Sequence, residues 1–363
     1  MSSIRWKVPV LAPVIGLTLF WLAATLYHAR PSTAERPGVG EAAAVTVRVP
    51  LANGGLSERM SMKKVTKSDA LWQRLLTPEQ YRIARGKGTE RAFCGSFYNH
   101  KQSGLYVCIC CGLPLYHARA KFDSGTGWPS FFEPVAPENV SEHPDHSHGM
   151  VRTEILCTRC DAHLGHVFDD GPPPSGRRHC LNSESLAFIP DDLTVDPEKP
   201  DRKLELATFG MGCFWGVEAL FREVPGVVSA ESGYSGGTVP WPSYEEVCEH
   251  GTGHAEVVLV RFDPAQVTYE QLLDVFWKNH DPTQLNRQGP DVGDQYRSAV
   301  FSHAEAQKKA AEASKQKLEE AKAFARPIVT QITAAAPFYR AEEYHQRYFE
   351  KHPEAGCHII RRK

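Results

Sequence analysis

The chain has 363 residues, of which 42% are hydrophobic and 23% are charged, and its formal net charge is -2. On a prior of about 150 residues per domain, this length predicts roughly two to three domains. The near-neutral charge argues against a nucleic-acid binder, which normally has a strongly basic face.

An uncharged apolar run over residues 8–27 follows Arg5 and Lys7. About 20 apolar residues are enough to cross a bilayer as a helix, and basic residues before the run favour a cytoplasmic N-terminus. We therefore expect residues 1–28 to be a signal anchor that holds the rest of the protein outside the cytoplasm, on the periplasmic or extracytoplasmic side. A cleaved signal peptide, which would release a secreted protein, and a plain apolar tail are the alternatives.

A tether and a first domain are expected after the apolar run. Residues 29–67 are rich in Ala, Gly, Ser and Pro and lack an apolar period, which predicts a flexible tether. Residues 69–85 are expected to be helical, with a second helix start at Thr77-Pro78-Glu79. Short strands separated by turns are then expected at residues 104–108, 150–156 and 180–189. Residues 68–190 are thus predicted to form a mainly β domain.

A linker is expected at residues 191–203, where Pro197 and Pro200 stand among charged residues. Beyond it, expected strands and helices alternate over residues 204–363, which predicts an α/β (or α+β) domain. The expected strands are 204–209 and 255–262, and the expected helices are 213–222, 269–279 and 304–323. The chain is therefore predicted to be a multidomain protein.

Ten cysteines in so long a chain do not make a disulfide scaffold. Two CxxC pairs stand out, and each can place two thiolates one tetrahedral edge apart. Together they predict one structural Zn²⁺ ion, bound by Cys108, Cys111, Cys157 and Cys160. Redox-active pairs or disulfides are the alternative. Cys110 is out of step with these ligands and is interpreted as a bystander.

The segment around Cys180 has the composition of a catalytic site. A strand would put Arg178, Cys180 and Asn182 on one face, and a guanidinium beside a thiol favours the reactive thiolate. His163 and His166 lie upstream, with Asp170 able to orient one imidazole. Trp128 offers an apolar ring.

Residues 69–189 resemble the B-type methionine sulfoxide reductases. The matching stretches are residues 88–93, 106–112, 124–131, 163–168 and 178–183. The resemblance implies that Cys180 attacks the sulfoxide sulfur and that Trp128 holds the methyl group. It further implies a donor and positioning network of His163, His166, Asp170, Arg178 and Asn182. Many relatives have a resolving cysteine where Thr126 stands here, which leaves Cys94 as the expected resolving thiol.

A second reactive thiol is expected at Cys213, which follows a strand and opens a helix. Unpaired N–H groups and the helix dipole stabilise an anion at that position. Phe214 and Trp215 come next and can form an aromatic wall for a methyl group. Sulfoxide reduction also requires proton donors for the departing oxygen, and a buried Glu with a raised pKa could serve as the acid. The candidate donors in this half are Tyr244, Glu256, Asp291 and Tyr296.

Residues 205–359 resemble the A-type methionine sulfoxide reductases. The matching stretches are residues 212–216, 233–237, 253–256 and 294–298. The resemblance implies Cys213 as nucleophile, Phe214 and Trp215 as the methyl pocket, and Glu256, Tyr244 and Tyr296 as donors to the oxygen. Asp291 would position a water or a substrate group, and Cys357 would be the resolving thiol. Cys248 is interpreted as structural.

The two resemblances imply an enzyme that reduces methionine sulfoxide, free and in proteins. The S-epimer would react at Cys213 and the R-epimer at Cys180. Each nucleophile would form a sulfenic acid and then a disulfide, which a thioredoxin-like dithiol would reopen. We expect a monomer. The alternatives are an exported thiol–disulfide oxidoreductase with redox-active CxxC pairs and, less in keeping with so many donors, a zinc-stabilised binding module.

Overall fold

The structure is a computed structural model, and it describes residues 43–51, 54–196 and 198–355. The expected anchor and most of the expected tether before Ala44 lie outside these residues, as does Cys357. Within the described stretches, no helix combines the length and the apolar character that spanning a bilayer requires.

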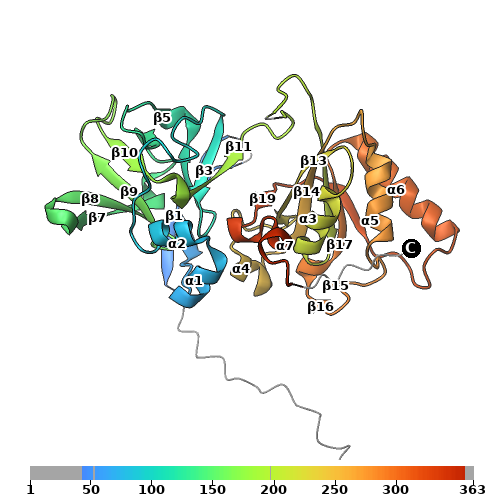
Figure 1. Cartoon of the computed structure of the whole chain (residues 1–363). Helices are drawn as coiled ribbons and strands as arrows, with labels where there is room; N and C mark the ends of the chain where they lie inside the picture. The colour runs from blue at the N-terminus through green and yellow to red at the C-terminus, as the bar shows by residue number, and fades with distance from the viewer. Residues whose placement is uncertain (1–42, 52–53, 197, 356–363) are drawn as a thin grey trace, which may run out of the picture. The chain divides into compact units, whose positions relative to one another are not determined.

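The N-terminal domain is mainly β, as predicted. Its larger sheet is antiparallel and has six strands in the order β5-β6-β10-β9-β8-β7, with a three-stranded sheet β11-β3-β4 beside it in the same core (Figure 1). The strands of the larger sheet are β5 (Lys121–Phe122), β6 (Ser130–Phe131), β7 (Val140–Asp145), β8 (Arg152–Cys157), β9 (His163–Phe168) and β10 (Arg178–Leu181). Those of the smaller sheet are β3 (Gly104–Cys108), β4 (Pro114–His117) and β11 (Leu186–Pro190).

Two short helices precede these sheets, α1 (Asp69–Leu75) and α2 (Pro78–Ala84). The predicted second helix start is confirmed, because the Thr77 side chain accepts from the Gln80 N–H and completes a capping box. The strand expected at 180–189 is wrong as a single element. A 3-10 turn at Ser183–Ser185 divides it into β10 and β11, which belong to different sheets.

The tether expected at residues 29–67 is wrong from Ala44 onwards. Strands β1 (Ala44–Val47) and β2 (Met60–Lys63) pair there in an antiparallel ladder. Their apolar side chains, with Val47 fully buried and Met62 nearly so, belong to the core of the N-terminal domain. The Ala- and Gly-rich composition concealed these few buried positions.

The C-terminal domain has a six-stranded mixed sheet in the order β18-β17-β12-β14-β13-β19, in which only β17 and β18 are parallel within the described residues. Of the two predicted fold classes, α/β and α+β, the mostly antiparallel sheet fits α+β better. The strands are β12 (Glu205–Met211), β13 (Val227–Ser235), β14 (Ala255–Phe262), β17 (Ser298–Ser302), β18 (Gln331–Ala334) and β19 (Tyr339–Arg340). A separate hairpin pairs β15 (Arg287–Gln288) with β16 (Asp291–Val292).

Helices α3 (Phe214–Arg222) and α5 (Tyr269–Lys278) bury their apolar sides against the same face of this sheet, and α6 (Glu305–Glu320) packs beside α5 (Figure 1). Phe209 of β12 anchors this core, because its ring stacks on Phe221 of α3 at 5.0 Å and contacts Phe276 of α5 at 5.4 Å. Two short helices, α4 (Tyr244–Cys248) and α7 (Tyr348–Lys351), follow β13 and β19. The three helices predicted in this domain are confirmed, each to within a few residues at its ends.

The linker expected at 191–203 is partly folded onto the C-terminal domain. Arg261 of β14 donates to the carbonyls of Leu193 and Val195 at 2.7 and 2.5 Å. The Asp196 side chain is fully buried and pairs with Arg202. These contacts fix the start of the C-terminal domain several residues before its first strand.

Candidate functional site

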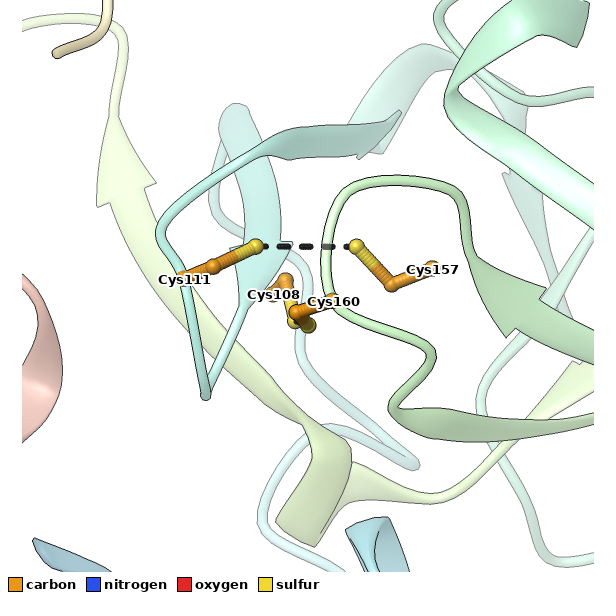
Figure 2. A group of neighbouring side chains, drawn as sticks. All are labelled: Cys108, Cys111, Cys157 and Cys160. Carbon is orange, nitrogen blue, oxygen red and sulfur yellow. Dashed lines mark hydrogen bonds between the residues drawn. The ribbon is translucent and has the colours of Figure 1, made fainter. Parts of the chain in front are cut away.

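A four-cysteine cluster joins the two sheets of the N-terminal domain. Cys108 ends β3 and Cys157 ends β8, and Cys111 and Cys160 lie in the turns that follow. Figure 2 shows the four sulfurs converging between these turns. Cys108 Sγ lies 3.6 Å from Cys160 Sγ, and Cys111 Sγ lies 3.6 Å from Cys157 Sγ.

The spacing of these sulfurs fits a tetrahedral metal ion. All four ligand atoms lie within 4.8 Å of one another, and all four residues are buried. A Zn–S bond of about 2.3 Å implies S···S edges of about 3.8 Å, close to the observed distances. Both turns end on a left-handed residue, Gly112 at φ 70° and Asp161 at φ 56°. The predicted ligands therefore come together, and Cys110 is buried beside them without belonging to the set.

The Cys180 thiol lies on β10, half-buried at the wall of a cavity of about 120 Å³. Antiparallel pairing puts Cys180 opposite His166 on β9. The cavity is lined by Thr89, Trp128, Arg152, Gly165, His166, Phe168, Cys180, Leu181 and Asn182. Three of the predicted site residues, Trp128, His166 and Asn182, thus share one cavity with the predicted nucleophile.

Two opposing effects act on the Cys180 thiol. Burial is the larger effect and raises its pKa, while the positive charge of Arg178 and hydrogen bonds from Thr126 and Arg178 act in the opposite direction. The expectation that Arg178 favours the thiolate is right in direction, but burial outweighs it. The resting thiol therefore keeps its proton at neutral pH.

The partners of the two histidines differ from the expectation. Asp170 orients neither imidazole, because both of its oxygens accept from Arg178, at 2.9 Å each. His163 Nδ1 instead lies 2.7 Å from Glu154 Oε1, and His166 Nε2 lies 2.8 Å from Asp145 Oδ2. That part of the Asp170 prediction is wrong. Both acids were missed because only the register of β7, β8 and β9 brings them beside the histidines.

His163 lies deeper than the cavity wall. Its side chain is 2% exposed, and its Nε2 has no hydrogen-bond partner among the described residues. Burial lowers the pKa of His163, although Glu154 acts against this shift. Glu154 also pairs with Lys87 at 2.7 Å.

Backbone contacts fix the indole of Trp128. Its Nε1 donates to the Glu90 carbonyl at 3.1 Å, and the Glu90 N–H donates to Asn182 Oδ1 at 3.0 Å. Asn182 also donates to the Leu164 carbonyl at 3.2 Å. Asn182 therefore positions the loop that holds Trp128, a role that the sequence motif alone does not reveal. Cys94 is an exposed free thiol in the neighbouring loop, where Phe93 N–H bonds to the Gly127 carbonyl at 2.8 Å.

The Cys213 thiol is half-buried at the N-cap of α3, as predicted. The next residue, Phe214, donates its backbone N–H to Glu256 Oε2 on β14 at 3.1 Å. Glu256 is 1% exposed, and burial raises its pKa to about 8, with the nearby charge of Asp291 acting in the same direction. A carboxyl protonated at neutral pH thus lies beside the predicted nucleophile.

The remaining predicted donors lie near this carboxyl. Burial raises the pKa of Tyr296, and the charges of Glu256, Cys248, Cys213 and Asp291 add to the rise. Burial also raises the pKa of Tyr244. Its hydrogen bond with the Cys248 thiol and the charge of Glu256 act in the same direction. These six groups are therefore close enough to influence one another's pKa. The interpretation of Cys248 as structural overlooks its contact with Tyr244.

Trp215 is held on one face and at its edge. Its ring stacks on Tyr348 with centroids 3.7 Å apart and planes at 5°, and Nε1 donates to His345 Nδ1 at 3.0 Å. Phe214 is 1% exposed and packs on His345 at 5.1 Å. His345 is a further site residue that motif reasoning missed. Its signal is the run of aromatic and titratable residues at 339–348.

Comparisons with known proteins cover both domains. A family model described as peptide methionine sulfoxide reductase matches residues 205–363, and a SelR domain model matches residues 76–190. The peptide methionine sulfoxide reductase MsrA of Methanosarcina acetivorans is 61% identical over 154 residues, which are 42% of this chain and 82% of that protein.

This chain belongs to the methionine sulfoxide reductases. The MsrB of Hahella chejuensis is 61% identical over 127 residues, which are 35% of this chain and 91% of that protein. The MsrB of Acinetobacter baylyi is 58% identical over 139 residues, which are 38% of this chain and all of that protein. The N-terminal domain is thus the MsrB half and the C-terminal domain the MsrA half, in the order that the sequence predicts.

Proposed function

We propose that this reductase uses two independent nucleophiles, Cys213 for the S-epimer of methionine sulfoxide and Cys180 for the R-epimer, in free and protein-bound substrates. One observation carries the proposal. Each half places a half-buried thiol beside an anchored indole, Trp128 or Trp215, with proton donors at hand. An indole for the methyl group, a sulfur nucleophile and an acid are what sulfoxide reduction requires.

In the MsrA half, the Cys213 sulfur attacks the sulfoxide sulfur while the S–O oxygen receives a proton. Glu256 is the donor, because its carboxyl is protonated at neutral pH, and the Tyr244 and Tyr296 hydroxyls hold the oxygen as its charge develops. The oxygen leaves on Cys213 as a sulfenic acid, and methionine departs as the reduced thioether. Burial keeps Glu256 protonated and the charge of Asp291 adds to this effect, while Asp291 also positions water or substrate.

In the MsrB half, the Cys180 proton passes to a base as the sulfur attacks, since burial keeps the resting thiol protonated. We assign this role to His166, whose imidazole lines the same cavity. Arg178 stabilises the thiolate as it forms, while Asp170 holds the guanidinium. His163, buried and held by Glu154, lies behind the cavity wall with its ring 5.4 Å from that of His166, and it belongs to the positioning network of the site.

A second thiol regenerates each nucleophile by condensing with the sulfenic acid, which releases water and forms a disulfide. We propose Cys357 for Cys213 and Cys94 for Cys180. A thioredoxin-like dithiol then reduces the disulfide and is itself oxidised. The exposure of Cys94 supports this role, since the reductant must reach the bond.

We further propose that Cys108, Cys111, Cys157 and Cys160 hold one structural Zn²⁺. All four positions of a tetrahedral ion are filled by protein thiolates, so the ion would stabilise the fold without contacting substrate. The rival thiol–disulfide oxidoreductase would need redox-active CxxC pairs, and the burial of all four sulfurs opposes that role.

The apolar run of residues 8–27 supports a further proposal, that an uncleaved N-terminal anchor holds a monomeric enzyme outside the cytoplasm. Secretion after cleavage is the alternative. Fractionation of cells followed by N-terminal sequencing tests both: an intact N-terminus in the membrane fraction supports the anchor, and a shortened soluble protein contradicts it.

The two-site proposal is tested with purified epimers of methionine sulfoxide and dithiothreitol. The wild-type chain, Cys180→Ser and Cys213→Ser are compared. We expect Cys180→Ser to lose only R-epimer reduction and Cys213→Ser to lose only S-epimer reduction. Loss of both activities in either variant, with the fold intact by circular dichroism, would contradict two independent sites.

A further inference from the structure

The cavity beside Cys180 contains a cation to which the mechanism gives no role. Arg152 of β8 lines this cavity together with Trp128, His166 and Cys180. Its side chain is only 20% exposed. A guanidinium keeps its charge at any physiological pH, so the cavity carries a fixed positive charge close to the reacting sulfur.

The Arg152 guanidinium is fixed at one end by hydrogen bonds, and not all of its N–H groups have an acceptor. One terminal nitrogen donates to Asp145 Oδ2 at 2.7 Å and to Ser147 Oγ at 3.1 Å. The Nε of Arg152 is buried and has no hydrogen-bond partner among the described residues. A buried charged donor is costly unless an acceptor reaches it. Because Nε itself is closed off, the exposed part of this incompletely paired guanidinium is what a ligand oxygen entering the cavity would meet.

The acids near the cavity are already occupied. The same oxygen of Asp145 that binds Arg152 also binds His166 Nε2, and the other oxygen accepts from the Ser147 N–H at 2.9 Å. Asp170 uses both oxygens on Arg178. Each of these two carboxylates is thus paired with a guanidinium, so neither leaves an uncompensated negative charge that would oppose an incoming anion.

We propose that Arg152 binds a carboxylate of the substrate and makes the Cys180 site selective for methionine sulfoxide next to a negative charge. This carboxylate is the α-carboxylate of free or C-terminal methionine sulfoxide, or the side chain of an adjacent acidic residue. The inference rests on Cys180 being the nucleophile for the R-epimer. In this role Arg152 is a specificity residue, and it takes no part in the transfer of oxygen.

The experiment uses three R-sulfoxide substrates: N-acetyl-methionine sulfoxide, and N-acetyl-methionine sulfoxide extended by glutamate amide or by glutamine amide. The two extended substrates differ only in charge. Steady-state kinetics with dithiothreitol are measured on the full chain and on Arg152→Met. We expect KM to rise about tenfold for at least one carboxylate substrate, as the loss of a charge-assisted hydrogen bond predicts, while the glutamine substrate stays within about twofold and kcat is unchanged. The substrate that responds identifies the source of the carboxylate.

Arg177→Met is the matched control. Arg177 also pairs with an acid of β7, Glu142, through two hydrogen bonds of 2.6 and 2.8 Å, but it does not line the cavity. We expect its KM values to match the wild type for all three substrates. A KM for the glutamine substrate that rises as much in Arg152→Met as the KM for the carboxylate substrates would show that Arg152 acts only through Asp145 and His166 and would overturn the proposal. No change in KM for any of the three substrates would overturn it as well. A wild-type chain inactive on every R-sulfoxide would instead refute the assignment of Cys180.

Discussion

Glu256 Oε2 accepts a hydrogen bond from the Phe214 N–H at 3.1 Å, so a carboxyl on β14 is tied to the first residue of α3. The same helix begins directly after Cys213. The bond fixes the acid relative to the nucleophile through the backbone. A carboxyl oxygen is an effective donor only while it carries its proton.

The pH dependence of S-epimer reduction should therefore report on Glu256. Burial raises the pKa of this carboxyl to about 8, so it is protonated below that pH and loses its proton above it. We expect the rate of sulfenic acid formation at Cys213 to fall as the pH rises through about 8. Glu256→Gln should lower the rate roughly a hundredfold at neutral pH, the size typical of general acid catalysis, and should abolish the alkaline fall. Single-turnover release of methionine measures both effects.

Glu218→Gln provides the control for that experiment. Glu218 is also 1% exposed, has a pKa raised by burial, and lies on α3, but it bonds to Ser232 and to the Arg347 backbone. This variant should keep the alkaline fall. If Glu256→Gln kept it as well, the acid would have to be another group.

Glu154 should matter for the R-epimer because it holds His163 at 2.7 Å in a buried position. We expect Glu154→Gln to lower kcat for R-sulfoxide roughly ten- to a hundredfold, as the loss of a charge-assisted hydrogen bond predicts, and to leave S-sulfoxide reduction unchanged. Lys87→Met should have a much smaller effect, because the Lys87 side chain is 64% exposed and solvated ion pairs contribute little. Equal losses in the two variants would contradict a specific role for the Glu154–His163 contact.

The zinc proposal predicts different behaviour for two buried cysteines of the cluster. Cys157→Ser removes a ligand and should reduce the zinc content to far less than about one ion per chain, with a clear fall in the Tm of the MsrB half, since structural zinc contributes directly to folding. Cys110→Ser changes a fully buried thiol outside the ligand set and should keep the zinc. Metal analysis and calorimetry of both variants test this prediction. A wild-type chain free of zinc would contradict it.

Thr126 offers a test of the recycling step. Its hydroxyl bonds to the Cys180 thiol, so a sulfur at this position would lie within reach of the sulfenic acid. We expect Thr126→Cys to form a disulfide with Cys180 after one turnover with R-sulfoxide, seen by mass spectrometry of the linked peptides. Thr126→Ser should form none there. If Cys94 is the natural resolving thiol, the Cys94–Cys180 linkage should disappear in Thr126→Cys as the new one appears.

The sequence was sufficient where chemistry follows from local spacing. The two CxxC turns, the Cys213 N-cap and the helix start at Thr77 depend on residues only a few positions apart, and the structure places them as expected. The partners of His163 and His166 could not be predicted in this way. Glu154 and Asp145 reach them from neighbouring strands, and the spacing of the two histidines does not determine the pairing register of those strands.

Residues 180–189 illustrate a second limit. Their composition suits one continuous strand, yet the turn at Ser183–Ser185 sends the chain from the Cys180 sheet into the sheet of the first CxxC turn. Asn182 lies at this corner, and its side chain is used to fix the Glu90 backbone. A local pattern cannot show such a change of sheet, because either half of the segment would be an acceptable strand alone.

The difference in burial between the two sets of thiols has a consequence for an enzyme that works where oxidants are present. The four cluster cysteines are each 2% exposed or less, whereas Cys180 and Cys213 open to solvent. Hydrogen peroxide or hypochlorite therefore reaches the two nucleophiles and the exposed Cys94 before the cluster sulfurs, and a sulfenic acid at either nucleophile can be reduced again in the normal cycle. With Zn²⁺ bound as proposed, over-oxidation at the nucleophiles would end catalysis and leave the buried cluster intact, so chains inactivated by oxidants should retain their zinc.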